Sequence, residues 1–208
     1  MKRSRYSKVL LPVLALAVVF VTAAGAVTPS PRKMVLTRLD LSSAFVRDGA
    51  ARVTNADVVA GGGATQAQLT SWGRIDGYKV AYKIKSNRAL ANKLTGPIYV
   101  ASSANTYSAA AGAHAARLVQ LASLKKTAGI HSAKGRRVGN ESKLFTYKQS
   151  AKVQGLTITY VVYIYTWRSG SNNASVMVEG IKGRIKLAAA TKLALKQQSR
   201  IRGAYSAG

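Results

Sequence analysis

Residues 156–181 read LTITYVVYIYTWRSGSNNASVMVEGI, and this stretch decides the fold. Residues 156–168 alternate between two faces and are rich in β-branched and aromatic residues, which predicts a long strand. Residues 169–173 are Ser, Gly and Asn, the composition of a hairpin turn, and 174–181 can return as a second strand. The stretch therefore predicts an antiparallel hairpin.

The remaining chain supplies further strands and two long helices. Strands are predicted at 78–85, which alternates apolar and basic residues, at 98–102 and at 138–148. Helices are predicted at 106–126 and 187–201, where apolar residues recur at steps of three and four. The predicted fold class is α+β: a mostly antiparallel sheet with two main helices packed on one face, a two-layer sandwich.

The N-terminus has the pattern of an export signal. Its first residues are basic, with Lys2, Arg3, Arg5 and Lys8. An uncharged stretch, 9–26, follows and ends on Ala24-Gly25-Ala26. We expect a signal peptide at 1–26, a linker at 27–35, one α+β domain at 36–202 and a flexible tail at 203–208. The protein is then secreted or extracytoplasmic, or is tethered to the membrane if the N-terminal segment is not cleaved.

The charge balance is strongly basic. The chain has 32 Lys and Arg against 6 Asp and Glu, a formal charge of +26, and no cysteine. The lack of cysteine excludes a disulfide scaffold and a lipidated cysteine. The charge favours anionic partners, an envelope polymer or an acidic lipid surface, or reflects solubility alone. Nucleic acid is not expected as the physiological partner of an exported chain.

One surface carries a binding hypothesis. The first expected strand of the hairpin places three aromatic residues on one face, and cations of the strand at 78–85 join them if both strands share a sheet. The hypothetical site is Lys79, Lys83, Lys85, Tyr163, Tyr165 and Trp167. Aromatic planes among cations suit flexible anionic polymers. The alternatives are an ordinary solvated sheet face, or a face that helices or loops cover to make a lipid pocket.

A second basic surface lies on the last helix, where Lys192, Lys196 and Arg200 are four residues apart. Such a stripe is either a solvated helix face or a contact with an acidic membrane surface.

No catalytic or metal-binding constellation is present in the sequence, and no cofactor is expected. His114 is predicted to be a core or boundary histidine on the apolar side of a helix, and Glu141, at the start of a strand, to pair with a cation. The six acids are scattered one by one, which argues against paired-carboxylate chemistry. We therefore expect a protein that is not an enzyme, an expectation that a cleft containing His114 or Glu141 would reverse.

Several segments together carry a resemblance. They are WGRIDGY at 72–78, VGNES at 138–142, YTWRSG at 165–170 and LALKQQSRI at 193–201. In this order behind a signal peptide, they resemble a group of uncharacterised secreted proteins of actinobacteria and related Gram-positive bacteria. The resemblance implies a compact exported α+β domain akin to extracellular sensor or lipoprotein domains. It implies no activity and no site residues.

The sequence thus predicts an exported, non-enzymatic domain that binds anionic envelope material through a basic and aromatic surface. The alternative prediction is a small-molecule or lipid carrier or sensor domain with a pocket between sheet and helices. The sequence gives no indication of the oligomeric state.

Overall fold

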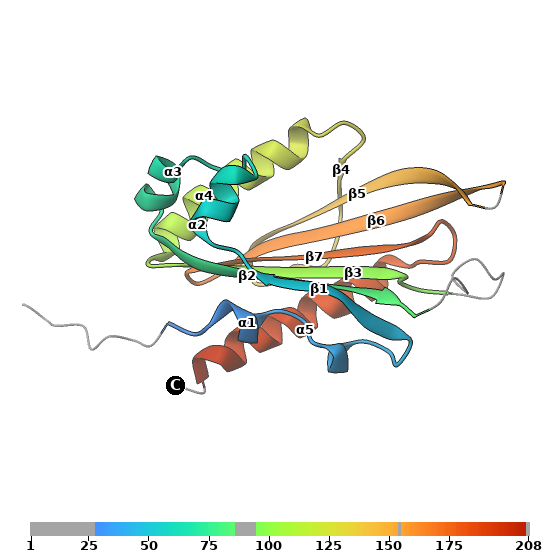
Figure 1. The fold of residues 1–208 in the computed structure, drawn as a ribbon, viewed down its shortest axis with the longest axis horizontal. Coiled ribbons are helices and arrows are strands. Elements are labelled where there is room, and N and C mark those ends of the chain that lie inside the picture. Colours follow the sequence, from blue (N-terminus) through green and yellow to red (C-terminus); the bar gives the residue numbers. More distant parts are fainter. Residues whose placement is uncertain (1–27, 86–94, 154, 207–208) are drawn as a thin grey trace, which may run out of the picture.

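The computed structural model describes residues 28–85, 95–153 and 155–206 (Figure 1). The expected signal peptide, 1–26, lies outside the described residues. The fold is α+β, as predicted, and is built on a seven-stranded sheet whose neighbours are all antiparallel. In spatial order the strands are β1 (Phe45–Arg52), β2 (Arg74–Ile84), β3 (Tyr99–Tyr107), β7 (Asn172–Ile181), β6 (Leu156–Ser169), β5 (Asn140–Val153) and β4 (His131–Ala133).

Two long helices and several short ones surround the sheet: α1 (Pro31–Met34), η1 (Arg38–Asp40), α2 (Asn55–Ala60), α3 (Gln66–Ser71), α4 (Ala110–Lys126) and α5 (Leu187–Ser206). The capping box of Thr65 and Gln68 begins α3. Helix α4 begins later than predicted, because β3 continues to Tyr107, which pairs with Arg74 of β2. Within the described residues, no helix has the length and apolar character needed to cross a membrane.

Helices cover both faces of the sheet, so the expectation of two helices on one face is wrong. Thr166 and Trp167 are neighbours in β6 and therefore point to opposite faces. Arg117 of α4 donates to Thr166 Oγ1 at 2.9 Å, whereas Trp167 Nε1 donates to Gln198 of α5 at 2.7 Å. Figure 1 shows the same division, with α2, α3 and α4 above the sheet and α5 and α1 below it.

The main core lies between the sheet and α5. Its large buried side chains include Trp167, Tyr165 and Tyr82. Their polar atoms have partners: Tyr165 Oη contacts Thr191 Oγ1 of α5 at 3.0 Å, and Tyr82 Oη donates to the Leu36 carbonyl at 3.2 Å. Aromatic residues with a polar atom are buried in this way when that atom has a hydrogen-bond partner.

The N-terminal segment belongs to this core, which corrects the expected linker at 27–35. Residues 31–34 form α1, and Met34 and Val35 are buried in the same cluster as Trp167. The physical reason is that these apolar side chains fill the space between α5 and the sheet. At the other end, α5 continues to Ser206, so most of the expected tail at 203–208 is helical.

A chain of hydrogen bonds through Gln197 ties the segment after α1 to β3 and α5. The Leu36 amide donates to Ser102 Oγ at 3.0 Å, and Ser102 Oγ donates to Gln197 Oε1 at 2.8 Å. Gln197 Nε2 in turn donates to the carbonyl of Ser103 at 2.8 Å. Gln197 and Ser102 are fully or almost fully buried, so each of these groups depends on the others for its hydrogen bonds.

We predict that Gln197→Leu destabilises the fold by about 1–3 kcal/mol, because it leaves the buried Ser102 hydroxyl without its acceptor and removes the side-chain donor to the Ser103 carbonyl. Urea unfolding followed by circular dichroism measures the effect. Ser199→Ala, at an exposed position of the same helix, is the control and should change stability by less than about 0.5 kcal/mol. Equal stabilities of Gln197→Leu and the unchanged protein would show that the chain of bonds is not stabilising.

Candidate functional site

The predicted aromatic and basic face does not exist as one open surface. Trp167 and Tyr165 are at most 1% exposed, beneath α5, because their large apolar areas form the core there. Tyr163 is on the same face and is partly buried against that core. Lys79 and Lys83 lie on the opposite face of the sheet, since they alternate with Tyr78 and Tyr82 of β2.

Each predicted cation of β2 has its own surroundings. Lys83 is ion-paired with Asp48 at 2.5 Å. Lys85 is exposed just beyond the end of β2. Lys79 is exposed and lines a groove that is described below. The structure therefore brings one of the six predicted residues to a concave surface, and separates it from the aromatic residues.

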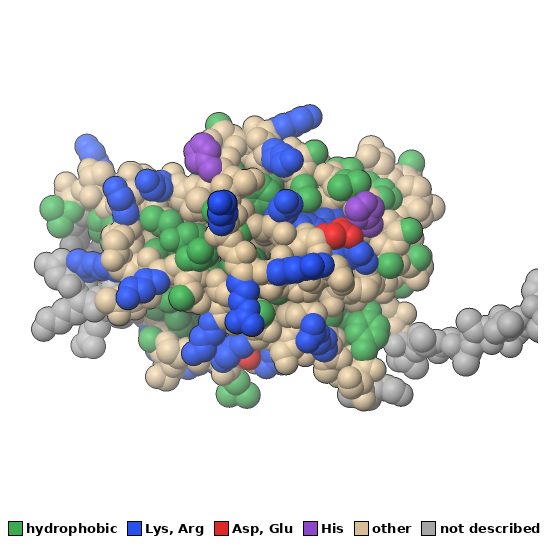
Figure 2. All heavy atoms as spheres, turned by 180° about the vertical axis from the view of Figure 1, so that it is seen from behind, with side chains coloured by type: hydrophobic (Ala, Val, Ile, Leu, Met, Phe, Trp, Pro, Cys, Tyr) green, Lys and Arg blue, Asp and Glu red, His purple; other side chains and the backbone are tan. Residues whose placement is uncertain are grey.

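The predicted stripe on α5 is mostly occupied by a contact within the chain. Arg200 Nε is 2.6 Å from Asp40 Oδ2, and Lys196 Nζ donates to the carbonyl of Asp40 at 3.0 Å. The Arg200 guanidinium also holds the pKa of Asp40 below its ordinary value, against the opposing effect of burial. Of the three residues, Lys192 alone is exposed, and the other two are partly buried. Figure 2 shows Lys and Arg side chains spread over one whole face of the molecule without a single compact patch.

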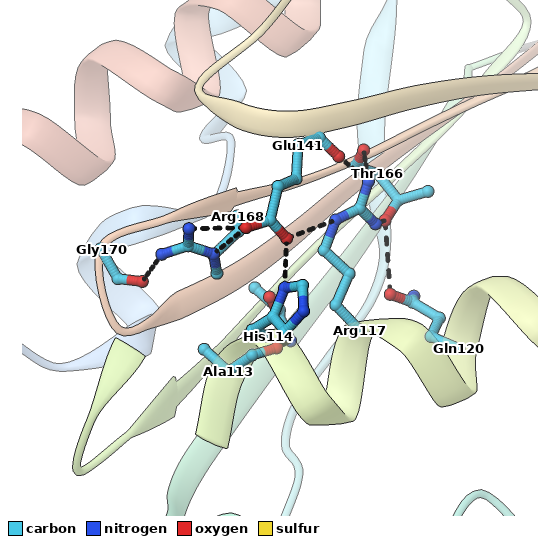
Figure 3. A network of polar contacts seen from close by, with 9 residues as sticks. Ala113, His114, Arg117, Gln120, Glu141, Thr166, Arg168 and Gly170 are labelled. Atoms are coloured by element: carbon cyan, nitrogen blue, oxygen red, sulfur yellow. Dashed lines mark hydrogen bonds and ion pairs between the residues drawn. The ribbon is translucent and has the colours of Figure 1, made fainter. Parts of the chain in front are cut away.

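His114 and Glu141, which are distant in sequence, meet in a network between α4 and the sheet (Figure 3). Oε1 of Glu141 accepts from Arg168 Nη2 at 2.6 Å, and Oε2 is 2.9 Å from His114 Nδ1. Arg117, which is 1% exposed, donates to the carbonyl of Glu141 and to Thr166. The predicted salt bridge of Glu141 is confirmed. His114 was predicted to lie in the core or at its boundary, and its side chain is about half exposed, so it is not part of the core.

A local backbone irregularity places Glu141 in this network. The register of β5 with β6 shifts between Asn140 and Lys143, and Glu141 has a φ of 52°, which is uncommon for a residue other than glycine. Hydrogen bonding to Arg168 is the largest reason why the pKa of Glu141 falls to about 2. The network therefore fixes the N-terminal half of α4 onto β5 and β6.

Beyond this attachment, α4 rises away from the sheet toward its C-terminal end (Figure 1). The result is a groove of about 640 Å³ on the α4 side of the sheet, which we call the sheet-face groove. Its floor is made of small residues of four strands: Gly49, Ala51, Ala81, Ala101, Ser103 and Ser175. Larger side chains border the floor: Tyr99, Ile164 and Met177 from the sheet, and Gln120 and Leu124 from α4.

The strand register explains why the groove is hollow. Gly49, Ala81 and Ala101 pair in one row across β1, β2 and β3, so no large side chain stands there. Met177 of β7 and Ile164 of β6 continue the same row with larger apolar side chains. This row of the groove is thus apolar, and Lys79 is the cation among the residues that line the groove.

A smaller cavity of about 290 Å³, which we call the inner pocket, adjoins the groove beneath α2, α3 and α4. Ser103, Gln120 and Leu124 line both spaces. The polar side chains of the inner pocket include Arg74, Asn105, Tyr107 and Asn173, and its apolar side chains include Leu69, Trp72, Ala116 and Val119. None of His114, Arg117, Glu141 and Arg168 lines either space.

The sequence pattern of the groove cannot be recognised from the alternation of side chains along one strand. Lys79, Ala81 and Lys83 have the pattern of a solvated strand face, yet Ala81 lies on the groove floor. Only the pairing of Ala81 with Gly49 and Ala101 shows that small residues of three strands coincide. The inner pocket has a clearer signal, because Trp72 and Arg74 belong to the segment WGRIDGY at 72–78.

We predict that Glu141→Gln lowers stability at pH 7 by about 1–2 kcal/mol, an effect reduced by solvent because the Glu141 side chain is 33% exposed. The folded-state pKa of Glu141 is below its ordinary value of 4.5, so the ionised Glu141 stabilises the fold fully above that pH, and this contribution disappears as the pH falls toward 2. Urea unfolding of both proteins from pH 7 to pH 2 should show the difference shrinking below pH 4.5.

Glu179→Gln is the matched control. Burial raises the pKa of Glu179, so removing its charge at pH 7 should cause no such loss of stability. A Glu141→Gln difference that stays constant down to pH 2 would contradict the assigned role of the ionised carboxylate.

Comparisons with known proteins identify a structure with a similar fold, but no family to which the chain belongs. No protein-family model matches the chain, and no curated protein matches it in sequence. Among solved structures, the chain is similar to the extracellular domain of PknH from Mycobacterium tuberculosis, with a TM-score of 0.50 and 8% sequence identity. The match covers 85% of this chain and 98% of that domain. The fold is therefore one that a bacterial extracellular domain also adopts, while the resemblance to uncharacterised secreted proteins stays a prediction.

Proposed function

We propose that the protein is an exported, non-enzymatic domain that holds a small, mainly apolar molecule in the sheet-face groove, as a carrier or sensor domain does. The observation that carries the proposal is the groove itself, about 640 Å³ with an apolar lining. Ligand sites are concave, largely apolar spaces of roughly 300–1,000 Å³ with a few polar groups. The groove has each of these properties.

Export is supported by two independent observations. The N-terminal segment 1–26 has the composition of a signal peptide, and the similar solved structure is an extracellular domain. Outside the cytoplasm, an apolar molecule in water gains free energy when it binds in an apolar groove, because its surface is then removed from water. A groove of this kind therefore fits an exported domain that holds such a molecule.

A binding role is favoured over catalysis by the composition of the lining. The residues that line the groove and the inner pocket include no histidine and no carboxylate. Elsewhere in the described part of the chain, no group of three or more His, Asp or Glu is arranged to hold a metal ion. Acid–base catalysis generally depends on such residues.

Binding of anionic envelope polymers through Tyr163, Tyr165 and Trp167 has lost its structural basis, since two of these side chains are buried beneath α5. The basic surface in Figure 2 still attracts anions, but a dispersed charge acts as a salt-dependent field and does not form a site.

We predict that Ala101→Phe, which places a ring on the groove floor, weakens binding of the neutral apolar dye N-phenyl-1-naphthylamine by about tenfold or more. A filled groove loses the apolar area that the dye would bury, and tenfold corresponds to about 1.4 kcal/mol. Dye fluorescence in a titration measures the affinity.

The control is Ala122→Phe, at an exposed position of α4 outside the groove, which adds the same ring and should leave the affinity unchanged. Circular dichroism confirms that both variants are folded. Equal dye affinities for the unchanged protein and Ala101→Phe, or no binding by the unchanged protein, would overturn the proposal.

A further inference from the structure

Arg74, at the inner end of the cavity system, is a buried cation that forms no ion pair with any residue the structure describes. It is 6% exposed, and its three hydrogen bonds go to neutral oxygens. Nη1 donates to Asn55 Oδ1 at 2.7 Å, and Nη2 donates to Asn105 Oδ1 at 2.7 Å and to the Val53 carbonyl at 2.8 Å. A guanidinium has five N–H groups, so these bonds hold it in place without using its full donor capacity.

The two carboxylates that act on Arg74 have hydrogen-bond or ion-pair partners of their own. Asp57 and Asp76 both act on Arg74 electrostatically. Asp57 Oδ2, however, accepts from the Thr54 amide and hydroxyl at the start of α2. Asp76 binds Arg52 at 3.0 Å and the Gly77 amide at 2.8 Å. Burying a charge without a counter-charge is costly, so an anion that reaches Arg74 gains more from it than from an exposed lysine.

The backbone around Arg74 is built to accommodate it. A Cβ atom at Gly77 would lie 2.4 Å from Arg74 Nη2 and 2.5 Å from Asn105 Oδ1, so only glycine leaves room for the guanidinium there. Gly73, which precedes Arg74, has a φ of 62° and would meet Ser108 Oγ if it carried a side chain. Gly77 of the segment WGRIDGY at 72–78 thus leaves room for the guanidinium, and Gly73 allows the backbone before Arg74 to pass close to Ser108.

The inner pocket and the sheet-face groove form a polar end and an apolar end of one site. Arg74 lines the inner pocket, which shares Ser103, Gln120 and Leu124 with the groove. Lys79 lines the groove and lies two residues along β2 from Gly77, so a second cation faces the same region. An elongated ligand can place one end near Arg74 and its apolar body over Ala101 and Met177.

We propose that Arg74 binds the carboxylate of the ligand, and that the ligands of this domain are amphipathic carboxylates. This inference rests on the proposed function and specifies the chemical class of its ligand. Arginine suits a carboxylate because its N–H groups form charge-assisted hydrogen bonds, which are stronger than bonds between neutral groups.

The experiment compares dodecanoate with dodecanamide, its neutral analogue, by displacement of N-phenyl-1-naphthylamine at physiological salt. We expect the unchanged protein to bind dodecanoate about tenfold or more tightly than dodecanamide, because charge-assisted hydrogen bonds are stronger than hydrogen bonds between neutral groups. Arg74→Gln should reduce this preference to near one and leave dodecanamide binding unchanged. Arg137→Gln, at an exposed position, removes the same charge and should keep the preference.

Equal binding of the two compounds by the unchanged protein, or the same loss of preference in Arg137→Gln, would overturn the inference while leaving the groove as a binding site. Failure of the dye and both compounds to bind would overturn the proposed function together with it. If Arg74→Gln does not fold, Arg74→Lys tests the same point. It keeps the charge without the planar guanidinium, so it should weaken dodecanoate binding several-fold without affecting dodecanamide, and an unchanged dodecanoate affinity would contradict the proposal.

Discussion

The strand β6 is apolar on both of its faces, and the rest of the structure follows from the need to cover both. Trp167 and Tyr165 require burial on one side, where α5 lies and supplies Gln198 and Thr191 as hydrogen-bond partners. Thr166 faces the other side, where Arg117 attaches α4. Helix α5 runs along its face of the sheet, but α4 is held chiefly at its N-terminal half by the Glu141 network. The uncovered remainder of that face is the sheet-face groove.

The few acids of this basic chain are used to build the structure. Asp40, Asp48, Asp76 and Glu141 each form an ion pair, and Asp57 caps α2. Glu179 is half buried without an ion pair among the described residues. Most cations consequently keep an uncompensated charge, spread over the surface in Figure 2. A protein with this field draws anions toward itself, and Arg74 offers them a place that is shielded from water.

The class of the fold could be predicted from the sequence, and the coverage of the sheet could not. Alternation in β2 and the turn at 169–173 were sufficient for an antiparallel sheet. Residues 156–168 have large apolar residues at both alternating sets of positions, which in retrospect indicates a strand covered on both sides. The predicted binding face required one of these two sets of side chains to be exposed to solvent. Trp167 was the clearest sign against it, because so large an apolar side chain is seldom left in water.

The candidate site depends on strand register and on contacts between distant residues, which cannot be read from one sequence. Lys79 was predicted as a binding residue, but the small residues that form the groove beside it, Gly49, Ala81 and Ala101, are brought together only by the register of three strands. Glu141 was correctly paired with a cation, yet the left-handed backbone that turns it toward His114 has no pattern in VGNES at 138–142. The reason for a glycine at position 77 becomes clear only from the structure, where the Arg74 guanidinium occupies the space that a Cβ atom would fill.

The central claim, that the face of the sheet left free by α4 is a ligand site, is tested most directly by amide chemical-shift mapping during a titration with dodecanoate. Our account predicts shifts concentrated at Ala81, Ala101, Ser103 and Met177 on the sheet and at Leu124 of α4. Shifts that are absent there, or that gather on the outer face of α5, would contradict it.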